Sequence, residues 1–149
     1  MKFAAQFGAL LVAIGPATHA QGAATTAPKE IVVESYYRVK WGNIDEFKRL
    51  YERNEATLLR EMKRNGFVTA LSFEEPFTHM AGGPRWDFRA RITYRDAIGA
   101  VETGGSYDKA FEAAQAKFRP DKALFDKEQA QRMSLLEDHW DVVMMPASE

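Results

Sequence analysis

Apolar and polar residues alternate without a break between positions 86 and 95, in the segment WDFRARITYR. The apolar set consists of Trp86, Phe88, Ala90, Ile92 and Tyr94. The alternating, mostly charged set consists of Asp87, Arg89, Arg91, Thr93 and Arg95. A period of two indicates a β-strand with one apolar face and one charged face. The apolar face requires a covering layer, and the charged face must meet water, a partner or a ligand.

The rest of the chain supplies further strands and two helical regions. Strands are expected at residues 29–40, 67–75 and 135–145, which are rich in β-branched and aromatic side chains. Apolar residues recur at helical spacing across residues 43–64, and Asn65-Gly66 ends that helix. A second helical region covers residues 96–133, with breaks at Gly104-Gly105 and before Pro120.

The order strand, helix, strand, strand, helical region, strand is the ferredoxin-like βαββαβ pattern of the α+β class. Two right-handed crossovers place both helical segments on one face of a four-stranded antiparallel sheet. The other sheet face stays open. Because an open, half-apolar face is normally covered, we expect a homodimer that forms through the sheet face.

Three segments carry a resemblance to a known family: YRVK at 37–40, NIDEF at 43–47 and HWDVV at 139–143. With the element order, they make the chain resemble the dimeric α/β-barrel superfamily, which includes small monooxygenase-like and stress-related barrel domains. The likeness covers about residues 29–146 and concerns element order, not a catalytic signature. It implies that two ferredoxin-like units join their open sheet faces into a barrel.

The N-terminus has the pattern of a secretory signal peptide. Lys2 precedes an apolar run at 7–14 that is too short to span a bilayer, so no stable membrane insertion is expected. Small residues at 18 and 20 predict cleavage after Ala20 and a periplasmic or secreted protein. The predicted organisation is a signal peptide at 1–20, a flexible leader at 21–28 and a ferredoxin-like α/β domain at 29–146.

Composition narrows the function classes. The 149 residues suit one domain, and 46% hydrophobic content suffices for a core. The net charge of −1 argues against nucleic acid as a partner. The absence of cysteine excludes a thiol nucleophile and any disulfide. The acidic residues of the first helix, Glu55 among them, alternate with basic ones and are expected to form a solvated face.

If the helices cover the more apolar sheet face, the opposite face collects polar residues from several strands. These residues are Glu34, Tyr36, Arg38, Asp87, Arg89, Arg91, His139 and Asp141. Arg89 and Arg91 can present guanidinium groups to a carboxylate or phosphate, and Tyr36 with His139 adds a hydroxyl and an imidazole. The alternative, which we favour, is that these charges pair across neighbouring strands.

Two histidines lie outside the predicted signal peptide. His79 lies in a loop beside Gly82-Gly83, and loops over a rigid sheet often carry function. His139 and Asp141 share one strand face, so they can form an imidazole–carboxylate pair. His79 and His139 lack metal-ligand spacing, and we expect neither a metal nor another cofactor. The ligand-binding candidates are Tyr36, Arg38, His79, Arg89, Arg91, His139 and Asp141.

The favoured hypothesis is an exported, dimeric domain that binds a small anionic or aromatic ligand at its sheet face. One alternative is a cofactor-independent oxygenase or isomerase, in which Tyr36, His139 and Arg89 position a substrate and move a proton. Another is a structural or partner-binding dimer without a pocket. The sequence leaves open whether the protein is an enzyme.

Overall fold

The computed structural model describes residues 30–78 and 82–144. Its sheet has four antiparallel strands in the order β2-β3-β1-β4. The strands are β1 (Ile31–Val39), β2 (Val68–Glu74), β3 (Phe88–Tyr94) and β4 (Leu136–Met144). The two central strands come from opposite halves of the chain, which is the ferredoxin-like arrangement. The predicted fold class is confirmed.

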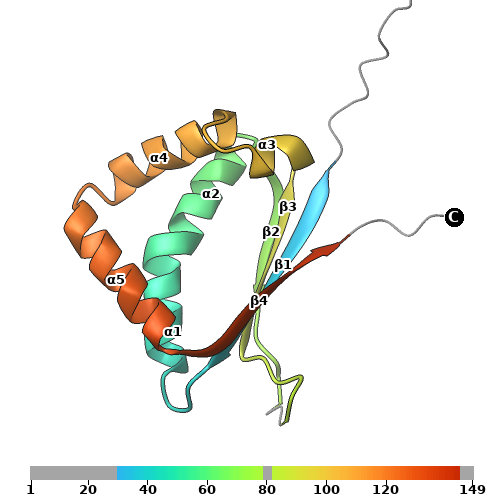
Figure 1. Cartoon of the computed structure of the whole chain (residues 1–149), viewed down its shortest axis with the longest axis vertical. Coiled ribbons are helices and arrows are strands. Elements are labelled where there is room, and N and C mark those ends of the chain that lie inside the picture. The colour runs from blue at the N-terminus through green and yellow to red at the C-terminus, as the bar shows by residue number, and fades with distance from the viewer. Residues whose placement is uncertain (1–29, 79–81, 145–149) are drawn as a thin grey trace, which may run out of the picture.

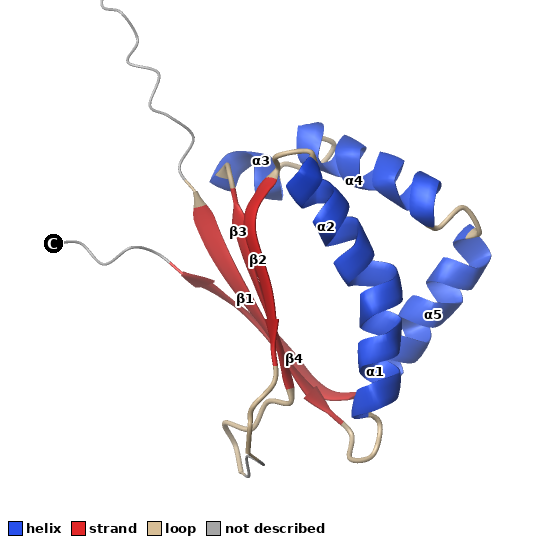
Figure 2. Ribbon diagram, turned by 180° about the vertical axis from the view of Figure 1, so that it is seen from behind, coloured by secondary structure: helices blue, strands red, loops and turns tan. Residues whose placement is uncertain are grey.

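The helices all lie on one side of the sheet (Figures 1 and 2). One long helix is built from α1 (Ile44–Tyr51), the π-helical segment η1 (Glu52–Ala56) and α2 (Thr57–Arg64). The second helical region is divided into α3 (Ala97–Val101), α4 (Ser106–Phe118) and α5 (Lys122–Ser134). The divisions fall at the glycines and the proline, as the sequence predicts.

The core forms where the long helix crosses the centre of the sheet. Its fully buried side chains are Phe47, Leu50, Ala56, Leu58 and Met62. Phe47 and Ala56 pack over Tyr37 and Phe88, which alternate into the same layer from β1 and β3. Met62 packs with Val68 and Ile92 of the sheet, and Leu58 packs with side chains of α4 and α5. Each large apolar side chain buried in this way contributes roughly 1.5–3 kcal/mol to folding. The amphipathic helix and the apolar strand faces therefore account for most of the fold.

The second helical region is not laid flat on the sheet. α4 packs against α2, and α5 packs against α1 and η1, so both form an outer layer over the long helix (Figure 1). Only one helix therefore lies directly on the sheet along most of its length. The part of β1 and β4 near Ser35 and His139 borders a cleft instead of a continuous apolar core.

The predicted face of β4 is wrong. Leu136 pairs with Val39 while Asp138 pairs with Arg38, so one extra residue, Glu137, is inserted between two paired positions. This β-bulge inverts the alternation for the rest of the strand. His139 therefore pairs with Tyr37 on the helix-covered face, and Trp140 comes to the open face.

Several predictions fall outside the described residues. The signal peptide, the whole leader and His79 all lie there, so the processing site, the domain boundaries and the role of this histidine stay predictions. Within residues 30–78 and 82–144, no helix is long and apolar enough to cross a membrane.

Candidate functional site

A cleft of about 290 Å³ opens between the sheet and the helix layer. Its walls come from β1, β3, β4, the long helix and α5. The polar or titratable residues that line it are Ser35, Tyr37, Tyr51, Glu55, Tyr94, Arg132, His139 and Asp141. The cleft exists because α5 rests on α1 and η1 and leaves this end of the β1–β4 pair without a helix directly over it. A concave site with several converging polar groups is the usual form of a small-molecule site.

His139 is held by its flat contact with a buried ring. The imidazole stacks on Tyr37, with ring centroids 4.4 Å apart and planes inclined by 21°. Its Nε2 atom lies 3.5 Å from Oδ1 of Asp141, at the limit of hydrogen-bonding distance. This nitrogen is buried and has no hydrogen-bond partner among the described residues. Its hydrogen-bonding capacity is therefore unused, and it belongs to a residue that lines the cleft.

Arg132 provides the positive charge of the cleft. Its side chain is buried, its Nε atom donates to Oε1 of Gln129 at 3.0 Å, and its Nη2 atom lies 3.4 Å from Oε2 of Glu55. The guanidinium group also stands over the ring of Tyr51, 5.2 Å from its centroid. The remaining nitrogen, Nη1, is buried and finds no partner in the described part of the chain. A buried arginine with one unpaired donor is suited to an anionic oxygen.

Glu55 lies on the π-helical segment and faces both of these groups. Burial raises the pKa of its carboxyl group, and this outweighs the opposing effects of Arg132, Gln129 and His139. The protonated form is thus favoured more than in water. π-helical segments within α-helices are frequent at functional sites, and here the segment lies beside the cleft.

Three tyrosines complete the lining. Burial raises the pKa of the Tyr37, Tyr51 and Tyr94 hydroxyl groups above the ordinary value. These hydroxyls therefore stay neutral at physiological pH, where they can donate hydrogen bonds without carrying charge. The cleft combines neutral donors, one arginine, one histidine and two carboxyl groups.

The other predicted candidates within the described residues lie on the open face of the sheet or at its edge, away from this cleft. Arg89 is paired with Glu74, lies 3.6 Å from Glu34, and donates to the hydroxyl of Tyr36 at 3.4 Å. The hydroxyl of Tyr36 in turn donates to Glu34 at 2.6 Å. Arg91 adds a second contact to Glu34, at 3.7 Å. These charges pair across strands, as the favoured sequence interpretation states.

Arg38 has a structural role at the end of this face. Its Nε atom donates to the backbone oxygen of Arg85 at 3.0 Å, and its Nη2 atom donates to that of Gly83. The predicted set therefore divides: His139 and Asp141 line the cleft, whereas Tyr36, Arg38, Arg89 and Arg91 belong to the open face and its edge.

Sequence reasoning missed Glu55 and Arg132. The expected solvated face is wrong for Glu55, because its side chain is only 26% exposed. Helical spacing contains the missing signal: Glu55 follows buried Tyr51 by four residues, and Arg132 follows buried Phe125 by seven. A charged residue on the apolar stripe of a helix is a candidate for a polar cavity. No group of three or more potential metal ligands occurs among residues 30–78 and 82–144.

Comparisons with known proteins concern the fold. No protein-family model and no curated protein matches the sequence. A NIPSNAP family protein from Agrobacterium tumefaciens is 14% identical, with a TM-score of 0.45 over 82% of this chain and 90% of its own. A dimeric ferredoxin-like protein from Thermobifida fusca is 14% identical, with a TM-score of 0.43 over 78% of this chain and 91% of its own.

A second dimeric ferredoxin-like protein, from an uncultured marine organism, is 5% identical, with a TM-score of 0.49 over 80% of this chain and 89% of its own. Identities at this level describe the fold alone. The order of the sheet has already established the ferredoxin-like class, and these proteins share it without pointing to a specific member.

Proposed function

We propose that the cleft between the sheet and the helices binds a small organic molecule through an anionic oxygen. The observation that supports this most strongly is that Arg132 and His139 line the same cleft, and that each has a buried nitrogen, Nη1 and Nε2, without a hydrogen-bond partner among the described residues. Leaving such groups unpaired costs about 1–3 kcal/mol each. A ligand oxygen that accepts from both removes that cost, whereas an apolar ligand does not.

The ligand is small. The cleft of about 290 Å³ lies at the lower end of the usual range for small-molecule pockets, so one or two rings fill it. Tyr37 and Tyr51 contribute flat, buried ring surface beside the polar groups. An aromatic carboxylate combines the two features, with its ring against the tyrosines and its carboxylate toward Arg132.

Calorimetric titration with benzoate tests the proposal. Wild-type protein is expected to bind saturably, and Arg132→Met is expected to weaken binding at least tenfold, which corresponds to about 1.4 kcal/mol. Arg91→Met is the matched control, because Arg91 is an arginine of the open face with half of its side chain exposed. Equal binding by wild type and Arg132→Met, or equal weakening by Arg91→Met, would refute the assignment of the cleft.

A second copy of the chain is proposed as the cover of the open sheet face. That face carries Trp140 stacked on Tyr36, with ring centroids 5.3 Å apart, and Trp86 edge-on to Tyr36 at 5.8 Å. Val142 and Met144 extend the apolar surface along β4 and are 38% and 42% exposed. An aromatic centre beside paired charges has the composition of a protein interface. A stable homodimer would bury about 1,200–2,000 Å² in total.

A catalytic function is the second candidate. His139 beside Asp141 has the arrangement of a general base, and Glu55 favours its protonated form, so an acid and a base line one cleft. The reaction would transfer a proton on an enolisable substrate. Exchange of the α-protons of a small β-diketone in deuterated water tests it by NMR. We expect His139→Gln to abolish any exchange above background while benzoate binding persists in weakened form.

Export is proposed on the N-terminal pattern alone. Lys2, the apolar run at 7–14 and the small residues at 18 and 20 support removal of residues 1–20. N-terminal sequencing of protein recovered from the periplasm is expected to begin at Gln21. Recovery of the Met1 start from that compartment would contradict the proposal.

A further inference from the structure

A second pocket, of about 220 Å³, lies at the other end of the sheet from the start of β1. It is formed between the turn after β1 and the loop that joins β2 to β3. Three large aromatic residues line it: Trp41 from the turn, and Phe77 and Trp86 from the loop. None of its described lining residues also lines the helix-side cleft. It is therefore a separate site.

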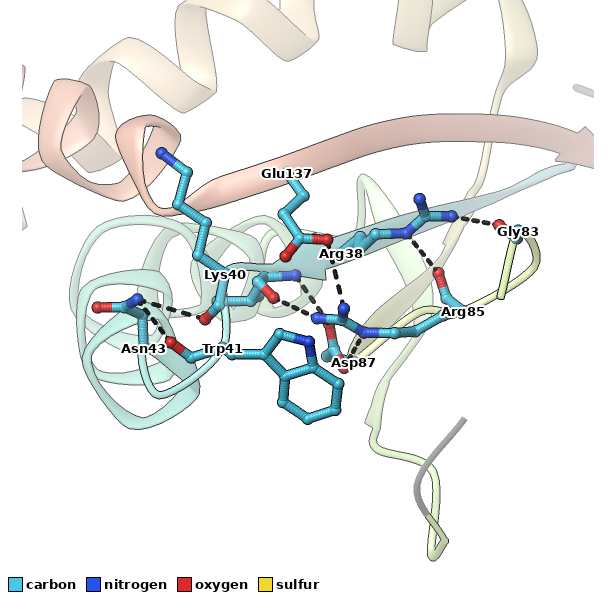
Figure 3. Close-up of polar contacts among 9 residues, drawn as sticks. Arg38, Lys40, Trp41, Asn43, Gly83, Arg85, Asp87 and Glu137 are labelled. Atoms are coloured by element: carbon cyan, nitrogen blue, oxygen red, sulfur yellow. Dashed lines mark hydrogen bonds and ion pairs between the residues drawn. The ribbon is translucent and has the colours of Figure 1, made fainter. Parts of the chain in front are cut away.

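A polar network fixes one wall of this pocket (Figure 3). The buried guanidinium group of Arg85 donates to Asp87 at 3.1 and 2.9 Å and lies 3.3 Å from Glu137. Oδ2 of Asp87 accepts from the backbone nitrogen of Val39 at 2.8 Å. Arg38 ties the same loop to β1 through the backbone oxygens of Arg85 and Gly83. Residues 83–87 are thereby anchored to β1, so the wall of the pocket that Arg85 and Asp87 form is in place without a ligand.

The charged groups around the pocket already have partners. Glu75 is bonded to Lys48 at 3.0 Å, and Asp87 to Arg85 at 2.9 Å. The ammonium group of Lys40 points away from Trp41 and donates to the backbone oxygen of Ser134 at 2.7 Å (Figure 3). An ionic ligand would thus compete with existing pairs. The pocket offers aromatic surface in place of an available charge.

That aromatic surface is exposed to an unusual degree. Trp41 is 65% exposed although the guanidinium group of Arg85 stands over its ring, 4.2 Å from the centroid. Phe77 is fully exposed. Both residues line the pocket, and neither belongs to a core cluster of the described chain. Apolar side chains gathered in this way mark a surface that binds something.

We propose that this pocket binds a neutral aromatic molecule of one or two fused rings, which packs against Trp41, Phe77 and Trp86. An apolar cavity of about 150 Å³ takes up benzene, so a pocket of about 220 Å³ accommodates a bicyclic ring such as indole. The ligand is expected to be neutral because the charged groups around the pocket are already paired. It is expected to be planar because three aromatic side chains would contact it.

The tryptophan side chains provide the readout. In a ¹⁵N-correlated NMR titration with indole, the side-chain N–H signals of Trp41 and Trp86 are expected to shift saturably. The signal of Trp140 serves as an internal control, because Trp140 lies on the open face and does not line the pocket. Phe77→Ala is expected to weaken indole binding at least tenfold and to leave the fold intact, since Phe77 is fully exposed. Trp41→Ala is the second variant, with the same expected loss.

Ile98→Ala is the matched control, because Ile98 is a 73% exposed apolar residue on α3 that does not line the pocket. The proposal is overturned if indole produces no saturable shift, or if Phe77→Ala and Trp41→Ala both bind indole as wild type does. It is also overturned if indole dissociates a dimer while it shifts these signals, because the pocket would then belong to a contact between copies. Tighter binding of tryptamine or indole-3-acetate than of indole would refute the preference for a neutral ring.

Discussion

The two faces of the sheet differ in how their polar side chains are paired. On the open face, Arg89 is paired with Glu74 and Glu34, and the hydroxyl of Tyr36 bonds to the same Glu34. On the helix-covered face, Arg132 and His139 each keep a buried nitrogen without a partner in the described chain. The charged groups of the open face thus have ionic partners, although the Nε atom of Arg89 is itself buried without a hydrogen-bond partner among the described residues. On the helix-covered side, the two residues with such nitrogens line the cleft.

This difference supports the proposed ligand-binding role of the cleft. A satisfied ion pair contributes to the fold and has nothing left to offer a ligand. An unsatisfied donor destabilises the empty protein and is compensated only on binding. Residue type alone does not separate the two cases, since Arg89 and Arg132 are both buried or half-buried arginines. Their surroundings separate them: Arg89 contacts carboxylates on both neighbouring strands, whereas Arg132 lines the cleft and contacts Glu55.

The largest expected effect is on stability, at Arg89. Arg89→Met removes the partner of Glu74 and one of the partners of Glu34, which is only 6% exposed, and leaves Glu34 with the Tyr36 hydroxyl and a 3.7 Å contact with Arg91. Breaking a buried pair in this way costs roughly 3 kcal/mol. Arg132→Met removes one hydrogen bond at 3.0 Å and a longer contact at 3.4 Å, so it should cost about 1 kcal/mol. Urea unfolding of both variants measures the two losses.

The proposed difference between the two faces is wrong if the two losses in unfolding free energy come in the reverse order. A loss at Arg132→Met equal to or larger than that at Arg89→Met would mean that the cleft arginine holds the fold together. Arg91→Met sets the baseline, because Arg91 contacts Glu34 only at 3.7 Å and is half exposed. An exposed pair of this kind is worth about 0–1 kcal/mol.

The sequence was sufficient to predict the fold but not to predict the candidate site. Alternation at residues 86–95 and helical spacing at 43–64 depend on burial, which is strong and local, so these elements are found where expected. The face of β4 depended on a single inserted residue, Glu137. A bulge leaves no periodic trace in a strand whose two faces are both mixed. His139 and Asp141 were therefore chosen as a pair but placed on the wrong side.

The partners of the cleft could not be predicted from spacing either. Glu55 and Arg132 are 77 residues apart in the chain, and they meet only because α5 packs on η1 rather than on the sheet. Their meeting depends on tertiary packing of the second helical region. The segment 96–133 shows weak amphipathic patterning, so its sequence indicates helices without indicating where they pack.

The next largest expected effect is on self-association. It is tested by substituting two neighbouring residues of β4 that lie on opposite faces of the sheet. Val142 lies on the open face, directly opposite Glu34, whereas Val143 pairs with Val33 on the helix-covered face. Val142→Lys places an ammonium group beside Glu34, so the monomer fold is preserved while the apolar surface is interrupted. We expect it to weaken the proposed dimer at least tenfold, or about 1.4 kcal/mol. Sedimentation or light scattering over a concentration series measures this.

Val143→Lys is the control for that experiment. It introduces the same charge one residue away, at a position that is 53% exposed, and should leave self-association unchanged. Equal behaviour of the two variants, or a wild-type protein that is monomeric at micromolar concentration, would exclude the open face as the contact between copies.

The smallest expected effect is a pH dependence of the unfolding free energy that arises from Glu55 in the cleft. Burial raises the pKa of Glu55 in the folded protein above the ordinary carboxyl value near 4.5. The folded state therefore binds the Glu55 proton more tightly than the unfolded state does. Its contribution to stability is complete below the unfolded pKa and is lost as the pH rises through the folded pKa. Glu55→Gln keeps the shape of the protonated group and removes this loss.

The difference in unfolding free energy between Glu55→Gln and wild type should therefore move in favour of the variant as pH rises from about 4 to 8. The change should be the smallest of those expected here, because the side chain remains partly exposed and Arg132 offsets part of the desolvation. Glu52→Gln provides the opposite sign on the same helix, since its hydrogen bond to Arg60 lowers the pKa of Glu52. Urea unfolding at several pH values resolves the two trends. If Glu55→Gln followed Glu52→Gln and lost stability relative to wild type as pH rose, the carboxyl group of Glu55 would be a satisfied partner of Arg132, and the cleft would resemble the open face.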